Sequence, residues 1–349
     1  EIVKEKSVLR SLIKLNEETA NACYLENEPL DELLERTEKR VFELAENGNS
    51  QEYVPIKQVV LNALDVIEKA SKTKGNVTGI PTGFIDLDYK LSGLQRSDLV
   101  LIAARPSMGK TAFVLNIAQH VAFRQNLAVA IFSLEMSKEQ LVNRLFSLES
   151  HVDAQVLRNG NLTDTDWEKL IEGAGTIGSS RMIIDDTSGI SISEMRSKCR
   201  KYKLEQGLDL IIIDYLQLMQ SAKRTESRVQ EISDITRNLK IMAKELNVPV
   251  IALSQLSRAA EKTAGRSDHR PQLSDLRDSG SIEQDADVVL FLYRAAYYNS
   301  QNGETEQANE NEAECIVAKN RHGETSVVRL GWDGAHTRFS NLDEIHEQY

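Results

Sequence analysis

A series of short, almost purely apolar runs separated by helix-like segments occupies the chain from residue 97 onward. The runs are DLVLIAA, AVAIFSL, RMIIDD, LDLIIID, VPVIALS, DVVLFLY and ECIVAKN. Strands without polar alternation are buried on both faces, as in a parallel sheet that helices cover on each side. The pattern therefore predicts an α/β fold with a mainly parallel central sheet flanked by helices.

The first part of the chain has a helical pattern instead. From Ile2 to about Glu46, apolar residues recur at three- and four-residue steps with a break at ENEP, which predicts two helices. A third, amphipathic helix is predicted from Pro55 to Ser71, with proline in its first turn. Because it lies between loops, it must bury its apolar stripe on another surface, either its own core or a neighbouring subunit.

The negative charge of the chain is concentrated in two segments. The net charge is −11, of which residues 1–54 carry −6 and the stretch 299–314 carries −5. The remainder is near neutral, so a local basic lining for nucleic acid is compatible with an acidic chain. We expect the stretch 299–314 to form an exposed insertion between two late strands.

No apolar run approaches the roughly 18 residues of a membrane span. The sequence therefore predicts a cytoplasmic protein without membrane contact. The cysteines Cys23, Cys199 and Cys315 lie far apart and lack the spacing of a metal site, so we expect reduced, buried thiols.

The sequence ARPSMGKT follows the first apolar run and precedes a helical pattern. It matches the phosphate-loop pattern GxxxxGK[ST], except that Ala104 replaces the first glycine, which a negative φ would permit. In such a loop, successive backbone N–H groups surround phosphate oxygens at a helix N-terminus. The predicted nucleotide-binding residues are Ala104, Arg105, Pro106, Ser107, Met108, Gly109, Lys110, Thr111 and Ala112.

Polar side chains at the ends of other apolar runs complete a hydrolytic site for ATP. Lys110 is expected to contact the β- and γ-phosphates, while Thr111 and Asp214 hold Mg²⁺. Glu135 is the candidate general base that activates water, with an exposed helix cap as the alternative. Gln255 is a candidate sensor of the γ-phosphate, although the pattern alone leaves that role open.

Longer motifs follow one another over nearly the whole chain. They are GIPTGFIDLD, ARPSMGKTAF, SLEMSKEQL, IIIDYLQLM, VIALSQLSR, LRDSGSIEQDAD and AKNRHG. Together they resemble the bacterial replicative DNA helicases of the DnaB family, whose motor is a RecA-like ATPase and in which Ala104 is usual. The resemblance implies a ring-shaped homo-hexamer that hydrolyses ATP, moves on single-stranded DNA and unwinds the duplex at the replication fork in the nucleoid.

The resemblance also implies a division into three parts. Residues 1–54 would be the tail of a helical N-terminal domain whose front part is missing. Residues 55–74 would be a linker helix that packs on the adjacent subunit, and residues 75–349 the RecA-like ATPase domain. The implied partners are a primase, a helicase loader and polymerase components.

Two segments resemble the family's DNA-contacting loops. Arg277, Asp278 and Gly280 occupy the loop that contacts the phosphate backbone of single-stranded DNA, although the family often has Glu at position 278. The alternative for Arg277 is a surface ion pair. The stretch KRTESR, residues 223–228, is a second candidate for a channel loop, with a solvated helix start as the alternative.

The motif AKNRHG places Lys319 and Arg321 at alternate positions of a strand, and hence on one face. In the family these two residues lie at the ATP of the next subunit, where Arg321 acts as an arginine finger in trans. His322 is expected to be a turn residue.

Two other functions share parts of this pattern. A recombination protein of the RadA type shares the KNR-x-G stretch, but it would require a four-cysteine zinc ribbon and a longer C-terminal tail. A non-motor assembly protein could use ATP binding alone, but such a protein would not require Glu135 as a base.

Overall fold

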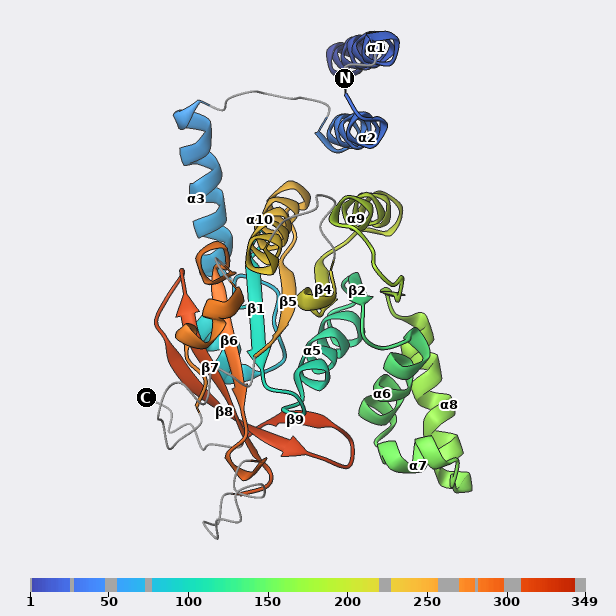
Figure 1. The fold of residues 1–349 in the computed structure, drawn as a ribbon, viewed down its shortest axis with the longest axis vertical. Coiled ribbons are helices and arrows are strands. Elements are labelled where there is room, and N and C mark those ends of the chain that lie inside the picture. The colour runs from blue at the N-terminus through green and yellow to red at the C-terminus, as the bar shows by residue number, and fades with distance from the viewer. Residues whose placement is uncertain are drawn as a thin grey trace. The chain divides into compact units, whose positions relative to one another are not determined.

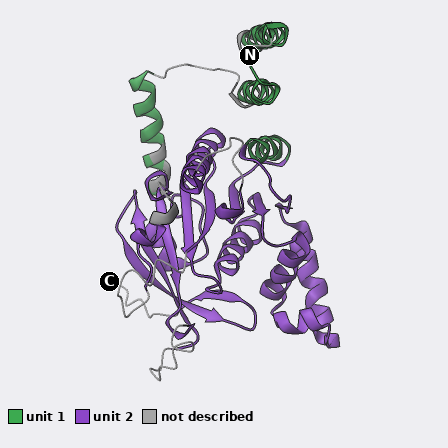
Figure 2. Cartoon of the chain, viewed as in Figure 1, with its two compact units in different colours: residues 1–74, 193–205 green, residues 75–192, 206–349 purple. Residues whose placement is uncertain are grey.

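The computed structural model describes residues 2–25, 28–47, 55–72, 77–219, 227–256, 270–279, 282–297 and 309–342. They divide into two compact units, which Figure 2 distinguishes by colour. Unit 1 comprises residues 1–74 and 193–205, and unit 2 comprises residues 75–192 and 206–349. Among the helices described, none combines the length and the apolarity that a bilayer crossing requires.

A pair of helices forms the first part of unit 1. Helix α1 spans Ile2–Leu25 and helix α2 spans Leu30–Asn47, as their periodicity predicts. They contact each other, and Leu15, Leu33 and Phe42 are each less than 10% exposed. An ion pair between Arg40 and Glu18 also joins the two helices.

Helix α9, Ile192–Gln206, contributes residues 193–205 to the same unit. The Glu35 carboxylate of α2 accepts a 2.7 Å hydrogen bond from Arg196 Nη1 and a 3.0 Å hydrogen bond from Ser193 Oγ. The Glu38 carboxylate accepts from Ser197 Oγ at 2.7 Å. Unit 1 is therefore held by charge-assisted hydrogen bonds as well as by apolar packing.

The third helix of unit 1, α3, spans Ile56–Lys72. Its apolar side chains are solvent-exposed in the isolated chain: Ile56 is 76% exposed, Leu64 56% and Ile67 63%. These three residues of the predicted apolar stripe therefore carry exposed side chains.

Unit 2 contains a nine-stranded sheet (Figure 1). The strand order is β3-β2-β4-β5-β1-β6-β7-β8-β9. The strands are β1 Leu99–Ala104, β2 Val129–Ser133, β3 Met182–Asp185, β4 Leu210–Asp214, β5 Val250–Gln255, β6 Val288–Tyr293, β7 Glu312–Asn320, β8 Ser326–Asp333 and β9 Arg338–Asn341.

Helices cover both faces of the parallel part of this sheet. Helix α5, Lys110–Gln119, buries Phe113 and Ile117 in a cluster that contains Val100 and Ile102 of β1. Helix α10, Arg228–Leu246, contacts β1 and β5, and its Leu239 is completely buried. Strands β1, β2, β4, β5 and β6 are almost entirely buried, which explains their continuous apolar sequences.

The other helices surround this core. They are α4 Ile85–Leu91, the π-helical turn η1 His120–Arg124, α6 Lys138–Ser150, α7 Ala154–Asn159, α8 Asp164–Ser179, the 3₁₀ turns η2 Leu216–Leu218 and η3 Leu273–Ser279, and α12 Ile282–Asp285. Capping boxes begin two of them: Ser137 with Gln140 at α6, and Thr163 with Asp166 at α8.

The sheet is parallel from β3 to β6 and antiparallel from β6 to β9. The apolar runs predicted β7 but not β8 and β9, because the short alternating patterns of these two strands lack a continuous apolar run. The last residues of the acidic stretch 299–314 belong to β7, and residues 299–308 lie outside the described part of the chain. The thiols of Cys199 and Cys315 are buried as expected, but the expectation for Cys23 is wrong, because that residue is exposed.

The motif GIPTGFIDLD, residues 79–88, forms a turn and the first four residues of helix α4. The buried carboxylate of Asp88 accepts hydrogen bonds from the Thr82 N–H at 2.7 Å, from the Thr82 hydroxyl at 2.8 Å and from the Gly83 N–H at 3.1 Å. Burial raises the pKa of Asp88, and these hydrogen bonds counteract that effect. The residues of this motif thus stabilise the turn before helix α4 through the hydrogen bonds of Asp88.

Replacing Asp88 with alanine should lower the free energy of unfolding by about 1–3 kcal/mol, because it leaves buried donors without an acceptor. Chemical denaturation followed by circular dichroism measures this change. Asp86→Ala, on the same helix, preserves the three bonds and should cost less. Equal losses from the two substitutions would contradict this account of the motif.

Candidate nucleotide site

The loop between β1 and α5 has the backbone shape of a phosphate cradle. Ser107 and Gly109 have positive φ values of 66° and 93°, and Gly109 immediately precedes the helix. A Cβ on Gly109 would lie 3.1 Å from Phe339 and 3.2 Å from Trp332, in a conformation that side chains rarely adopt. The first-turn N–H groups of α5, which have no partners within the helix, therefore face a loop suited to an anion.

Three other residues of the motif have structural roles. Ala104 ends β1 in strand conformation, paired in register with Gln255, so this position needs no glycine. Met108 and Ala112 are buried, at 1% and 3% exposure. Their side chains anchor the loop and the helix in the core, and their backbones remain the parts suited to phosphate.

Lys110 lies close to the ends of two strands. Its Nζ donates a hydrogen bond to the Ser254 carbonyl at 3.1 Å and lies 5.2 Å from the centre of the Tyr215 ring. Burial lowers the pKa of Lys110 to about 8, while the negative charges of Asp214 and Glu135 act in the opposite direction. An anionic ligand would therefore favour the protonated amine.

Thr111 and Asp214 are in direct contact. The Thr111 hydroxyl donates to Asp214 Oδ2 at 2.7 Å. Burial raises the pKa of Asp214, as does the charge of Glu135, and the Thr111 bond and Lys110 lower it. The Asp214 Oδ1 atom is buried without a hydrogen-bond partner in the described structure.

Glu135 lies two residues beyond the end of β2. Ser133 of that strand is in register with Asp214, and the Leu134 N–H donates to the Asp214 carbonyl at 2.7 Å. Glu135 is exposed, and its charge influences both Asp214 and Lys110. An exposed carboxylate beside the phosphate loop has access to the water that a base must activate.

Gln255 ends β5, beside Ala104, and its side chain is exposed. The side-chain amide of Gln217 forms hydrogen bonds with both backbone groups of Gln255. Gln217 Oε1 accepts from the Gln255 N–H at 3.2 Å, and Gln217 Nε2 donates to the Gln255 carbonyl at 3.1 Å. Gln217 follows the Asp214 strand, so the candidate sensor is linked to the segment that carries Asp214.

Lys319 and Arg321 lie elsewhere. The expectation that both occupy one strand is wrong, because β7 ends at Asn320 and Arg321 lies in the turn that follows. Strand β7 is antiparallel to β6 and pairs Asn320 with Val288. The end of β7 therefore lies on the side of the sheet where the parallel strands begin, which we call the second edge, whereas the phosphate edge is the side where they end. The phosphate loop follows the opposite end of β1, which is about 16 Å long at about 3.3 Å per residue. The structure therefore separates these two residues from the other predicted catalytic side chains of the same chain.

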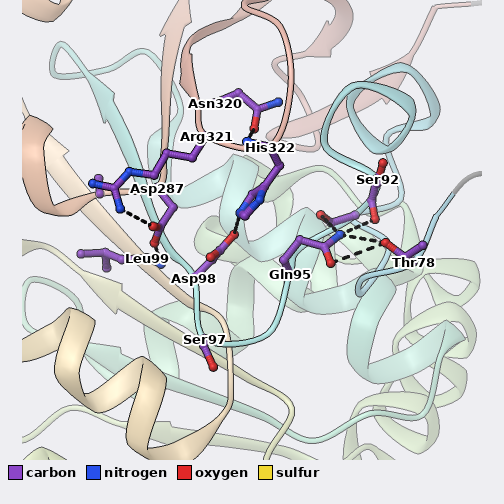
Figure 3. A network of polar contacts seen from close by, with 12 residues as sticks. Thr78, Ser92, Gln95, Ser97, Asp98, Leu99, Asp287, Asn320, Arg321 and His322 are labelled. Atoms are coloured by element: carbon purple, nitrogen blue, oxygen red, sulfur yellow. Dashed lines mark hydrogen bonds and ion pairs between the residues drawn. The ribbon is translucent and has the colours of Figure 1, made fainter. Parts of the chain in front are cut away.

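Local contacts hold both residues at this second edge. Arg321 Nη1 bonds to Asp287 Oδ1 at 3.0 Å (Figure 3). Lys319 Nζ donates to the carbonyls of Glu283 and Ala286 at 2.6 and 2.7 Å. Burial and the charge of Arg321 lower the pKa of Lys319. His322 lies in a turn, as predicted.

The predicted DNA-contacting residues are only partly described. Arg277 and Asp278 belong to η3, but the structure does not describe their side chains, and Gly280 lies outside the described residues. Of the second candidate loop, residues 223–226 lie outside as well. Arg228 begins α10, where it pairs with Glu231 and donates to the Gln217 carbonyl at 2.6 Å.

Three residues near these sites are not singled out by any sequence pattern. Arg144 of α6 interacts electrostatically with Asp214 and Glu135, and burial lowers its pKa. Gln217 and Asp287 are the other two. Gln217 lies inside the motif IIIDYLQLM, and Asp287 is the last residue of the motif LRDSGSIEQDAD. Neither motif indicates which side chains these residues contact.

Comparison with known proteins identifies the family. The model of the DnaB-like helicase C terminal domain matches residues 79–341, most of the chain. The chain belongs to the DnaB-like helicase family. It is thus a helicase with an ATPase core, and the predicted α/β, RecA-like fold is confirmed.

Individual relatives agree with this assignment. The chain is 50% identical over 343 residues to "Replicative DNA helicase DnaC" of Bacillus subtilis, covering 98% of this chain and 74% of the relative. It is 49% identical over 348 residues to "Replicative DNA helicase DnaB" of Geobacillus stearothermophilus, covering 99% and 75%.

Two solved structures resemble this helicase closely. One, described as an ATPase domain, superposes with a TM-score of 0.77 at 41% identity, covering 83% of this chain and all of that one. "The Structure Of A DnaB-Like Replicative Helicase And Its Interactions With Primase" gives a TM-score of 0.74 at 38% identity, covering 98% and 78%.

The site of this helicase fits a magnesium ion accompanying the nucleotide. The buried Asp214 Oδ1 atom has no hydrogen-bond partner among the residues that the structure describes. This atom and the adjacent Thr111 hydroxyl are hard oxygen donors of the kind that Mg²⁺ prefers. Thr111 and Asp214, the latter through the water shell of the ion, are the residues that would hold it.

The lowered pKa of Lys110 predicts a pH dependence of nucleotide binding. Because bound phosphate favours the protonated amine, the Kd for a fluorescent ADP analogue should rise by up to about tenfold per pH unit above pH 8. Titrations from about pH 7 to about pH 9.5 span the transition. Lys110→Arg stays charged in this range and should give a flatter profile. Equal slopes for the two proteins would contradict the assignment.

Proposed function

We propose that this replicative DNA helicase works as a ring-shaped homo-hexamer that moves along single-stranded DNA by hydrolysing ATP. The observation that carries the proposal is the separation of Lys110, Thr111, Asp214 and Glu135 from Arg321 at opposite edges of one sheet. A chain arranged in this way offers a phosphate site to one neighbour and an arginine to the other. Head-to-tail contacts of this kind close into rings when the rotation per subunit permits it.

Hydrolysis in this proposal uses the side chains at the phosphate edge. Glu135 accepts a proton from water as that water attacks the γ-phosphorus. The bond from the γ-phosphorus to the bridging oxygen of ADP breaks, giving ADP and phosphate. Lys110 compensates the charge on the phosphates, and the backbone N–H groups of the loop hold them. When Mg²⁺ is bound, it supplies additional charge stabilisation at the phosphates.

Arg321 of the adjacent subunit completes the site in trans, together with Lys319. Arginine fingers contribute about 10³- to 10⁵-fold to the rate in other nucleotide hydrolases. Loss of the γ-phosphate then changes the contacts of Gln255 and Arg321. The hydrogen bonds of Gln217 with the Gln255 backbone provide a connection from that sensor to the segment after Asp214.

DNA binding in the channel is assigned to Arg277, Asp278 and Gly280. An arginine forms a charge-assisted bond with a phosphate, and a glycine permits close approach of the backbone. Contacts of this kind hold the strand without reading its bases. The charge distribution of the sequence supports the assignment, because the acidic segments 1–54 and 299–314 leave the rest near neutral.

The remaining assignments rest on the family. Residues 1–54 form the tail of an N-terminal domain, residues 55–74 the linker helix and residues 75–349 the motor. The exposed stripe of α3 supports the docking of this helix on a neighbouring subunit. A primase is the proposed partner with most support, since one of the similar structures is named for its interactions with primase. A helicase loader and polymerase components at the replication fork, in the cytoplasmic nucleoid, complete the proposal.

Mixing two inactive variants tests the shared site. Glu135→Ala and Arg321→Ala should each lose most of the ATPase activity that single-stranded DNA stimulates. An equal mixture should regain part of it, because some interfaces then combine an intact Glu135 with an intact Arg321. An unchanged rate for Arg321→Ala alone, or a mixture as inactive as its components, would exclude a site shared between subunits.

Salt dependence tests the proposed DNA contact. The affinity for single-stranded DNA should fall steeply between about 50 and about 200 mM salt, since phosphate binding releases counterions. Arg277→Ala should weaken binding and reduce the slope of log affinity against log salt by about 0.7 to 1. Lys169→Ala, on the exposed surface of α8, is the matched control and should leave the slope unchanged. A parent affinity independent of salt would refute backbone binding.

A further inference from the structure

Asp287 is the residue directly before β6, and its carboxylate is buried, with only 4% of the residue's surface exposed. Its Oδ2 atom accepts hydrogen bonds from the Leu99 N–H at 2.8 Å and from Lys240 Nζ, and its Oδ1 atom accepts from Arg321 Nη1 at 3.0 Å. A single side chain thus joins the start of β1, helix α10 and Arg321. Figure 3 shows its position between Leu99 and Arg321.

The backbone of Asp287 strengthens this junction. Its carbonyl accepts the Arg321 N–H at 3.0 Å, and its N–H donates to the Leu99 carbonyl at 2.9 Å. Asp287 therefore holds Arg321 by both the main chain and the side chain. Leu99 is the first residue of β1, the strand that leads to the phosphate loop. Through Asp287, hydrogen bonds therefore fix Arg321 relative to β1.

The guanidinium of Arg321 is fixed at two nitrogens. Nη1 bonds to Asp287, and Nη2 donates to the Gln284 carbonyl at 2.7 Å. The side chain as a whole remains 48% exposed. Arg321 is therefore oriented by its own subunit and still accessible to another one. A side chain that is already oriented loses little conformational entropy when it contacts a ligand on the neighbouring subunit, which suits the role proposed for Arg321.

Asp98 belongs to the same cluster but has different partners. It accepts from His322 Nε2 at 2.6 Å and lies 3.7 Å from Lys240 Nζ. It is nearly as buried as Asp287, with 6% of its surface exposed. Asp98 therefore provides a matched control, because its substitution removes a buried charge from the cluster without removing the acceptor of Arg321.

We propose that Asp287 is the positioning residue for Arg321, holding the guanidinium in the orientation in which it serves the neighbouring subunit's ATP. The inference rests on the proposed role of Arg321 in trans. Asp287 touches neither ATP nor the reacting atoms and acts only through Arg321. Its effect therefore belongs to the subunit that donates the arginine, whereas nucleotide binding belongs to the other subunit.

The test begins with Asp287→Asn, which preserves the size of the side chain and removes its charge. The kcat for DNA-stimulated ATP hydrolysis should fall about tenfold or more, because misplacing a catalytic group by about 1 Å costs up to about a hundredfold. The KM for ATP and the Kd for a fluorescent ADP analogue should stay at the parent values, since the phosphate loop lies at the other edge. Asp98→Asn should retain the parent kcat.

Mixtures identify the side of the interface that is affected. Asp287→Asn mixed with Glu135→Ala should regain activity, because the first chain offers an intact phosphate site and the second an intact Arg321. Asp287→Asn mixed with Arg321→Ala should regain none, because both chains are impaired as donors. If both mixtures recover equally, the inference is wrong.

A second variant guards against loss of folding. Asp287→Glu keeps the charge that Lys240 and Leu99 require but displaces the guanidinium by about one methylene. The extra methylene in a buried site should lower the melting temperature somewhat, but the variant should keep the parent Kd for the ADP analogue, which shows that it is folded, and still lose kcat. If Arg321→Ala is inactive while both Asp287 variants keep the parent kcat, or if either variant raises kcat, the positioning role is refuted. If Arg321→Ala is itself fully active, the proposed finger fails instead.

Discussion

The pairing of parallel strands is the constraint on which the rest of the molecule depends. A parallel strand satisfies its backbone through both neighbours, and helices cover its two faces, so chemistry is confined to the two edges where strands end. Strand β1 lies between β5 and β6, and this position places Ala104 beside Gln255 at one edge and Asp98 near Asp287 at the other. Each edge then collects polar side chains from segments that are distant in sequence.

The charges at the phosphate edge are poised for an anion. Burial raises the pKa of Asp214 and lowers that of Lys110, so both groups are pushed toward their neutral forms, and burial also disfavours the charge of Arg144, which stays protonated. Partial compensation comes from the opposite charges nearby. A triphosphate with its metal ion would stabilise the charged forms, so the arrangement gains in electrostatic complementarity when the ligand binds.

The sequence predicted what local patterns determine. The parallel strands were recognisable because burial on both faces requires continuous apolar runs. The positions of Asp214 and Glu135 at strand ends were recognisable because both residues follow such runs. Strands β8 and β9 were missed because they alternate in the short patterns of an antiparallel extension. Arg144, Gln217 and Asp287 gain their roles from contacts with distant segments, such as the bond between Asp287 and Arg321, and no local pattern reports these. The separation of Arg321 from Lys110 also required the strand order.

The presence of complementary groups at opposite edges gives the subunit a polarity. With the role proposed for Arg321, a head-to-tail contact sets the arginine of one copy against the phosphate loop of the next. In an open row, the first copy keeps an unused arginine and the last an unused phosphate loop, so there is always one complete site fewer than there are copies. Only closure removes this deficit. If the proposed ring opens to admit DNA, it therefore gives up one hydrolytic site while the gap persists.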